Sequence, residues 1–149
     1  MPTPENAVRT DAGLVAELRM AVMRLRRRLA IERSPENELS LGATTVLGCL
    51  RRHGPMSIGE LARFERVQPP SMTRTVNCLE EGGYVVRRPH ESDGRQVVVE
   101  LTDQGRQTLA ADRARRDAWL ARRMADLTAD ERATLRAAAP LLQRLAQED

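Results

Sequence analysis

Lysine is absent from this chain of 149 residues, so all 24 of its positive charges are arginines. Aromatic residues are nearly absent as well: Phe64, Tyr84 and Trp119 are the only ones, which leaves little surface for stacking on a flat ligand. With 21 acidic residues the formal net charge is +3, and arginines nearly balance acids in each of the segments 1–65, 66–101 and 102–149. The net charge therefore permits nucleic-acid binding without arguing for it.

Potential metal ligands and catalytic groups are also few. Cys49 and Cys78 lie far apart, and His53 and His90 have no partner at metal-ligand spacing, which argues against a structural zinc site. We interpret both cysteines as small buried or half-buried residues rather than oxidation sensors. The segment 90–93, "HESD", holds His, Ser and Asp on adjacent turn residues, which cannot form an oriented catalytic relay. We expect no enzyme activity and no cofactor.

Long hydrophobic runs are missing too. The longest uncharged run, 39–50, has 12 residues, whereas a membrane-spanning helix needs roughly 20. The first residues, "MPTPENAVRTDAG", have neither the layout of a signal peptide nor that of an arginine-rich presequence. These absences predict a cytoplasmic protein without a membrane partner.

Apolar periodicity and capping residues predict helices over the first half of the chain. One apolar stripe runs through 11–33, which predicts a long first helix. A second helix follows the capping residue Ser40 and ends at Gly54. A short third helix follows the capping box in 57–60, "SIGE", and reaches about Glu65. A fourth helix begins at two prolines, 69 and 70, and ends at the glycines 82 and 83.

The pattern changes after these glycines. The β-branched runs "YVVRR" and "QVVVEL" flank the turn formers "PHESDG", which predicts a hairpin with its tip near 92–94. Thr102 is then expected to cap a long helix, which carries Leu109, Arg113, Leu120, Met124 and Leu127 near one side. A capping box in 128–131, "TADE", opens the last helix, in which Pro140 should produce a kink.

The order of these elements predicts a mainly α fold with a small β-hairpin wing. The length fits one domain, 1–149. Segment 40–102 is expected to form a winged helix-turn-helix. The helices in 11–33 and 103–147 carry apolar stripes that so small a central part could not cover. We therefore expect these helices to pack on each other and on a second copy of the chain.

Within this framework, several motifs resemble the MarR family of winged helix-turn-helix transcription regulators. They are a D-x-R-x5-L-T signature at Asp93, Arg95, Leu101 and Thr102, a "TR" pair at Thr73 and Arg74, "LEEGGYVVR" over 79–87, and "LA" at 61 and 62. The chain departs from the family pattern at Gly94, where arginine is frequent, and at Pro140, inside the last helix. The resemblance implies a homodimeric DNA-binding regulator, most often a repressor, that a small anionic or aromatic ligand can release from DNA.

The fourth helix is the expected recognition helix. Met72, Val76 and Leu79 share one face and should point inward, so the opposite face is available to the major groove. Arg74 is the best candidate for reading a base, because arginine can pair with both guanine acceptors. Serine and threonine hydroxyls and the helix N-terminus suit phosphates. The candidate contacts on this helix are Gln68, Pro70, Ser71, Thr73, Arg74 and Asn77.

The wing supplies the remaining candidates. Arg95, at the tip, would reach the adjacent minor groove, where negative potential attracts arginine. Asp93 would be repelled by phosphates, so we expect it to pair with a wing arginine and stabilise the loop, with Gly94 permitting the tight turn. Arg87 and Arg88, at the wing base, are candidate phosphate contacts. In the first helix, Arg26 and Arg28 flank the apolar stripe and are candidates for the edge of a ligand pocket.

These expectations define a homodimer that binds an inverted repeat in double-stranded DNA, with half-sites about 10 bp apart. The alternative is a winged-helix protein–protein interaction module without DNA recognition, which the balanced charge of 66–101 favours. Salt dependence separates the two, because arginine contacts to phosphates release counterions. Winged helices also serve as dimerisation domains of methyltransferases, but this chain has no room for a cofactor domain.

Overall fold

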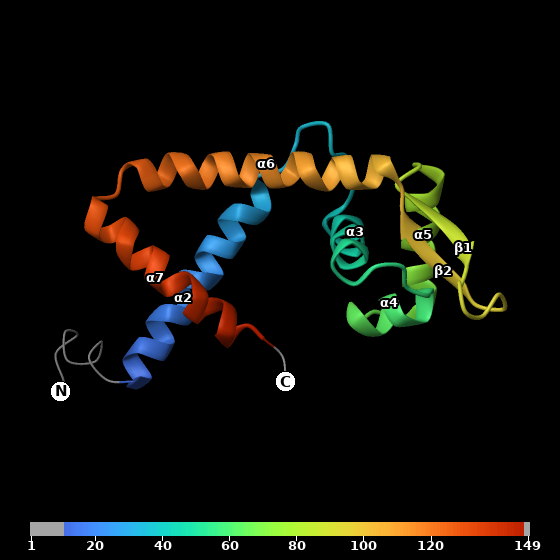
Figure 1. Cartoon of the computed structure of the whole chain (residues 1–149), viewed down its shortest axis with the longest axis horizontal. Helices are drawn as coiled ribbons and strands as arrows, with labels where there is room; N and C mark the ends of the chain where they lie inside the picture. Colours follow the sequence, from blue (N-terminus) through green and yellow to red (C-terminus); the bar gives the residue numbers. More distant parts are fainter. Residues whose placement is uncertain (1–10, 148–149) are drawn as a thin grey trace. The chain divides into compact units, whose positions relative to one another are not determined.

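Six helices and one β-hairpin make up the computed structural model, which describes residues 11–147 (Figure 1). The helices and strands are α2 (Asp11–Ile31), α3 (Leu41–His53), α4 (Ile58–Phe64), α5 (Pro69–Glu81), β1 (Val85–Pro89), β2 (Val97–Leu101), α6 (Asp103–Ala125) and α7 (Ala129–Leu145). The mainly α fold with a hairpin wing is thus confirmed.

The chain divides into two compact units. Residues Arg33–Ala114 form what we call the winged unit, which contains α3, α4, α5, the hairpin and the first half of α6. The described residues of Met1–Glu32 and Arg115–Asp149 form the helical unit, with α2, the second half of α6 and α7. The expected winged segment, 40–102, lies wholly within the first of these.

The predicted helix starts are confirmed by their hydrogen bonds. Ser40 Oγ accepts a bond from the Ala43 N–H at 3.1 Å at the start of α3. Capping boxes open α4, through Ser57 and Glu60, and α7, through Thr128 and Glu131. Two prolines occupy the first positions of α5. Local sequence signals therefore fix where these helices begin.

Two helix ends differ from prediction. The first helix ends at Ile31 rather than at 33. Arg33 instead belongs to the following connector, where its guanidinium donates to Leu39 O at 2.5 Å and to Thr44 Oγ1 at 3.1 Å. The long helix ends at Ala125, so Leu127, which we expected on its apolar side, lies outside it.

The hairpin has the expected strands and a wide tip. β1 and β2 pair antiparallel from Val85 opposite Leu101 to Pro89 opposite Val97. The free edge of β2 is also paired, because Met56 and Val99 exchange backbone hydrogen bonds of 3.1 and 2.7 Å. The segment between α3 and α4 thereby covers part of an edge that would otherwise be open.

The core of the winged unit lies between α3, α4, α5 and the hairpin. Figure 1 shows α5 beside the hairpin and α4 next to α5. The side chains at the centre of this core are the most buried: Leu47, Leu61, Met72, Val76, Leu79 and Val99. Because the buried face of α5 is part of this core, the direction of its opposite face is fixed.

A buried carboxylate holds the connector between α2 and α3. Asp112, on α6, is 0% exposed. It accepts hydrogen bonds from the Ser34 N–H at 2.8 Å and from Asn37 Nδ2 at 2.7 Å. These bonds provide the partners that a buried charge needs.

The base of the wing is joined to the start of α6. Thr102 Oγ1 donates to Gly83 O at 2.6 Å and accepts from the Gly105 N–H at 3.2 Å, which confirms the predicted cap. Gly105 packs so tightly that an added Cβ would collide with the carbonyl oxygen of Tyr84.

We predict opposite effects for two glycine-to-alanine changes. Gly105→Ala should lower the free energy of unfolding by roughly 1–3 kcal/mol, because the backbone of the wing base must move. Gly48→Ala, in α3, is the matched control: an added Cβ would meet nothing within 4 Å, so stability should rise by roughly 0.5–1 kcal/mol. Urea unfolding at one protein concentration measures both, and equal effects would contradict the packing of Gly105.

Candidate nucleic-acid interface

One face of α5 is buried and the other is open. Met72, Val76 and Leu79 are at most 2% exposed, as predicted. The turn before α5 is tight, since Arg66 has the left-handed φ of 53°. The residues that α5 leaves exposed are Pro69, Pro70, Ser71, Thr73, Arg74, Asn77, Cys78 and Glu81. The outer face of α5 is therefore mostly polar and carries one arginine, Arg74, and one acid, Glu81.

The N-terminus of α5 has few free donors. Pro69 and Pro70 have no N–H, and the N–H groups of Ser71 and Met72 both donate to Gln68 O, at 3.0 and 3.1 Å. The Gln68 side chain makes no capping bond. An anion here would meet the helix dipole and side chains rather than unpaired backbone N–H groups.

The two hydroxyls near this end differ. Thr73 Oγ1 donates to Pro69 O at 3.0 Å, so its hydrogen must turn away before it can bind a phosphate. Ser71 Oγ has no such bond within residues 11–147. Ser71 is the hydroxyl better prepared to donate.

Within residues 11–147, Arg74 and Arg95 have unpaired guanidinium groups, unlike the two arginines of β1, Arg87 and Arg88. Both are exposed, one on α5 and one in the loop between β1 and β2. Neither guanidinium has an ion pair or hydrogen bond in the described part of the chain. Both are therefore free to bind an anionic partner.

Asp93 stabilises the wing loop through the backbone. Its Oδ1 accepts from the Arg95 N–H at 3.1 Å, and its carbonyl accepts from the Gln96 N–H at 3.0 Å. The ion pair with a wing arginine that we expected does not form among residues 11–147. Because the bond uses the backbone of Arg95, its side chain stays free.

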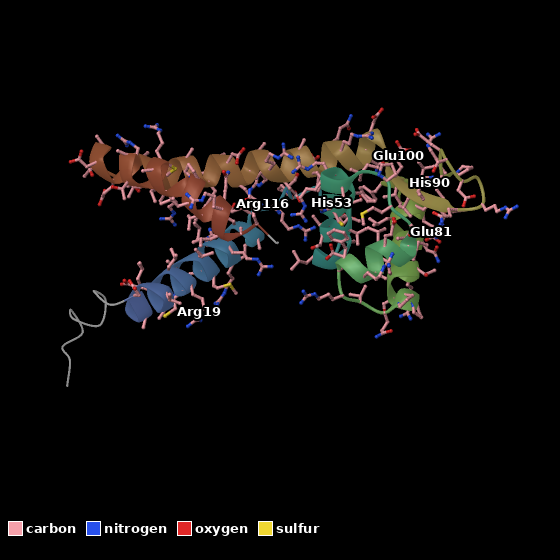
Figure 2. All side chains as sticks on the ribbon, turned by 60° about the horizontal axis from the view of Figure 1, so that its bottom comes forward. Arg19, His53, Glu81, His90, Glu100 and Arg116 are labelled. Carbon is pink, nitrogen blue, oxygen red and sulfur yellow. The ribbon has the colours of Figure 1, made fainter. Side chains whose placement is uncertain are left out.

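The two arginines of β1 are paired with acids. Arg87 Nη1 lies 2.6 Å from Glu80 Oε1 on α5, and its Nη2 donates to Asn77 Oδ1 at 2.6 Å. Arg88 Nε lies 3.1 Å from Oε2 of Glu100. Glu100, on β2, is labelled in Figure 2. As phosphate contacts, these two remain predictions that would require sharing or exchanging these partners.

The cysteines occupy opposite environments. Cys49 is 1% exposed, and its Sγ lies 3.7 Å from the sulfur of Met56. Burial raises the pKa of its thiol, and the neighbouring Glu65 carboxylate raises it further. Cys78 is exposed, so the expectation that it is buried or half-buried was wrong: it follows Arg74 by one helical turn on the open face.

We predict that a thiol reagent modifies only Cys78 in the native protein near neutral pH. The Cys49 thiol is shielded and protonated, so it should react only after unfolding. Mass spectrometry of the labelled peptides measures both sites, with Cys78→Ser as control. Equal labelling of this variant and the natural chain would contradict the assignment.

The helical unit contains an apolar groove of about 930 Å³. Residues of α2 and α7 form most of its lining, with Arg19, Arg26 and Arg116 among them. Arg19 and Arg116 are labelled in Figure 2. Of the two arginines expected at a pocket edge, only Arg26 lines this groove. Arg28 instead pairs with Glu32 at 2.8 Å and lies 5.0 Å above the Trp119 ring.

Residues 11–147 contain no group of three or more His, Cys, Asp or Glu side chains placed to hold a metal ion. None of their helices is both long enough and apolar enough to span a membrane.

A helix-turn-helix with an open second helix and a flanking hairpin defines the class of winged helix-turn-helix DNA-binding proteins. The MarR family profile matches residues 39–97. An HTH-type transcriptional regulator of Mycobacterium tuberculosis is 45% identical over 93% of this chain and 96% of its own length. A Bacillus subtilis protein named as a transcriptional repressor is 31% identical over 68% of this chain and 64% of its own.

A solved structure agrees with these sequence comparisons. A transcriptional regulator from Pseudomonas aeruginosa has a TM-score of 0.79 and 38% identity, covering 93% of this chain and 97% of that one. The chain belongs to the MarR family of HTH-type transcriptional regulators, which bind DNA. Its family is one of regulators, not of enzymes.

Proposed function

We propose that this protein is a homodimeric, sequence-specific repressor that binds an inverted repeat in double-stranded DNA. The observation that carries the proposal is the contrast between its arginines. Arg74 on α5 and Arg95 on the wing are exposed and uncommitted, whereas Arg87 and Arg88 are held by acids. Free cations thus lie on the two elements that a winged helix presents to DNA.

In this proposal α5 enters the major groove. Arg74 donates to the two acceptors of a guanine, which discriminates against other bases. Ser71, Thr73 and Gln68 bind phosphates beside it, and Pro70 packs against the backbone of the DNA. Asn77 lies about one helical turn further along the same face.

The wing enters the adjacent minor groove through Arg95. The narrow groove concentrates negative potential, so an arginine binds there without reading individual bases. Asp93 holds the loop in shape through the Arg95 backbone, as its 3.1 Å bond indicates.

A second copy of the chain covers the helical unit. None of the residues of α2 or α7 is buried in the single chain. Val15 is 65% exposed and Leu145 74%, and both line the apolar groove. An apolar surface of this extent is typical of an interface. A two-fold dimer would set two copies of α5 about 10 bp apart on DNA.

We also propose that a small anionic or aromatic ligand releases the dimer from DNA, with Arg26 at the edge of its pocket. Arg26 is one of three arginines in the lining of a largely apolar groove, which supports an anionic group on the ligand. The repressor role rests on the name of the Bacillus subtilis relative.

Two substitutions should affect DNA binding differently. Arg74→Ala should lower the preference for the selected duplex over a scrambled one by about 5- to 100-fold, since a base contact is lost. Arg95→Ala should weaken binding to all duplexes alike and reduce the slope of log K against log salt by about 1. Fluorescence anisotropy over a salt series measures both effects, on the best duplex recovered from a random pool.

If neither Arg74→Ala nor Arg95→Ala changes the affinity for DNA, the assigned interface is wrong. If the natural chain binds no duplex even at low salt, a protein-interaction module is the better reading, since such a module needs no phosphate contacts.

A charge in the groove should separate the dimer. Leu145→Glu places a carboxylate in the proposed interface, so the dimer should dissociate at least about tenfold more readily. Leu41→Glu is the matched control, because Leu41 is also exposed, at 60%, but lies in the winged unit. Analytical ultracentrifugation measures the dissociation constant of each variant, and equal constants would contradict this interface.

A further inference from the structure

Arg87 links the wing to the recognition helix by three hydrogen bonds. Its backbone N–H donates to Glu80 Oε2 at 3.2 Å, and its Nη1 donates to Glu80 Oε1 at 2.6 Å. Its Nη2 donates to Asn77 Oδ1 at 2.6 Å. The first two bonds use both oxygens of Glu80, so strand β1 is fixed to α5 at one point. The third reaches a residue on the open face of α5.

The third bond determines which way the Asn77 amide faces. A guanidinium has only donors, so the amide atom against it must be the oxygen. The Asn77 oxygen therefore turns toward β1, and Nδ2 with its two N–H donors turns away. Orientation of this amide follows from the chemistry of its partner and not from the shape of the side chain.

We propose, on the basis of the DNA-binding function above, that Arg87 is a positioning residue that makes Asn77 a donor-only contact to DNA. Asn77 then binds a base acceptor: guanine N7 or O6, thymine O4, or adenine N7. It cannot form the two-bond contact to adenine, because that contact needs the amide oxygen to receive the adenine amino group. Cytosine, which offers only an amino donor, is also disfavoured at this position.

Arg87 is better suited to this role than to binding phosphate itself. Its side chain is 28% exposed, and withdrawing it would leave Glu80 without its partner close to a negatively charged duplex. Arg88, the next residue, differs in each respect. It is 64% exposed, it pairs with Glu100, and no hydrogen bond or ion pair joins its side chain to α5 within residues 11–147. Arg88 therefore supplies a matched control.

The first experiment compares Arg87→Met and Arg88→Met by selection of duplexes from a random pool and sequencing. Arg87→Met frees the Asn77 amide to turn, so base preference at one position of each half-site should fall at least fivefold. Arg88→Met removes at most a phosphate contact, so any loss of affinity should be equal for all duplexes and every base preference should stay unchanged. The proposal is overturned if the two variants have the same base preferences. It is also overturned if Arg87→Met weakens binding to all duplexes uniformly and lowers the slope of log K against log salt by about 1.

Two further variants separate positioning from a merely structural role. In the Asn77→Ala background, Arg87→Met should cause no additional change in base preference, since its effect passes through Asn77. Asn77→Asp keeps the acceptor for Arg87 but removes the donor. The midpoint temperature of thermal unfolding of this variant should equal or exceed that of the natural chain. At low salt the variant should nevertheless lose the base preference. Retention of that preference by Asn77→Asp would overturn the proposal.

The selection also distinguishes two kinds of failure. If the natural chain recovers no sequence motif, the proposed DNA recognition fails as a whole. If it recovers a motif that Arg87→Met leaves intact, the proposed function stands and only the positioning role is wrong. A loss of affinity at one base position in Asn77→Ala supports the proposal, whereas an equal loss for all duplexes shows a phosphate contact and overturns it.

Discussion

Burial of one stripe of α5 determines what the winged unit presents to its surroundings. Met72, Val76 and Leu79 are inside the core that α3, α4 and the hairpin share. A helix has one rotation that buries this stripe, so Arg74 and Asn77 must face outward. The hairpin is attached to the same core through Val85, Val99 and Leu101. The wing and the recognition helix are thus positioned by a common set of apolar contacts, and the polar interface depends on them.

Pairing of charges then decides which outward groups are available. The segment 66–101 has as many acids as arginines, which by itself gives no reason to expect DNA binding. In the folded chain Glu80 and Glu100 form ion pairs with Arg87 and Arg88. The guanidinium groups of Arg74 and Arg95 have no ion pair among residues 11–147. An exposed ion pair contributes little to stability. The main consequence of these two pairs is that Arg87 and Arg88 are less available to a partner than Arg74 and Arg95. Arg74 and Arg95 are therefore available to an anionic partner although the segment as a whole carries no net charge.

Much of this fold could be predicted from the sequence because its signals are local. Ser40, Ser57 and Thr128 cap helices whose hydrogen bonds span three residues, and the alternating runs of the wing define their own pairing. The contacts that sequence reasoning missed join distant segments. Asp112 bonds to a connector 75 or more residues earlier, and Met56 pairs with the edge of β2. No periodicity encodes such partners.

The candidate site was predictable in part for the same reason. Helical periodicity placed Arg74 and Asn77 on the open face, whereas the partner of Arg87 depends on how a strand crosses a helix. The ion pair expected for Asp93 was replaced by a bond to the backbone, which a short side chain in a tight turn reaches more easily. Cys78 was misjudged because its apolar character was given more weight than its helical position.

In the proposed complex, α5 and the wing of two chains read DNA together. The most direct test is to select duplexes bound by the purified natural chain from a random pool and to sequence them. We expect an inverted repeat with half-sites about 10 bp apart and a guanine within each. Recovery of single, unpaired half-sites, or of no enriched sequence at low salt, would contradict it.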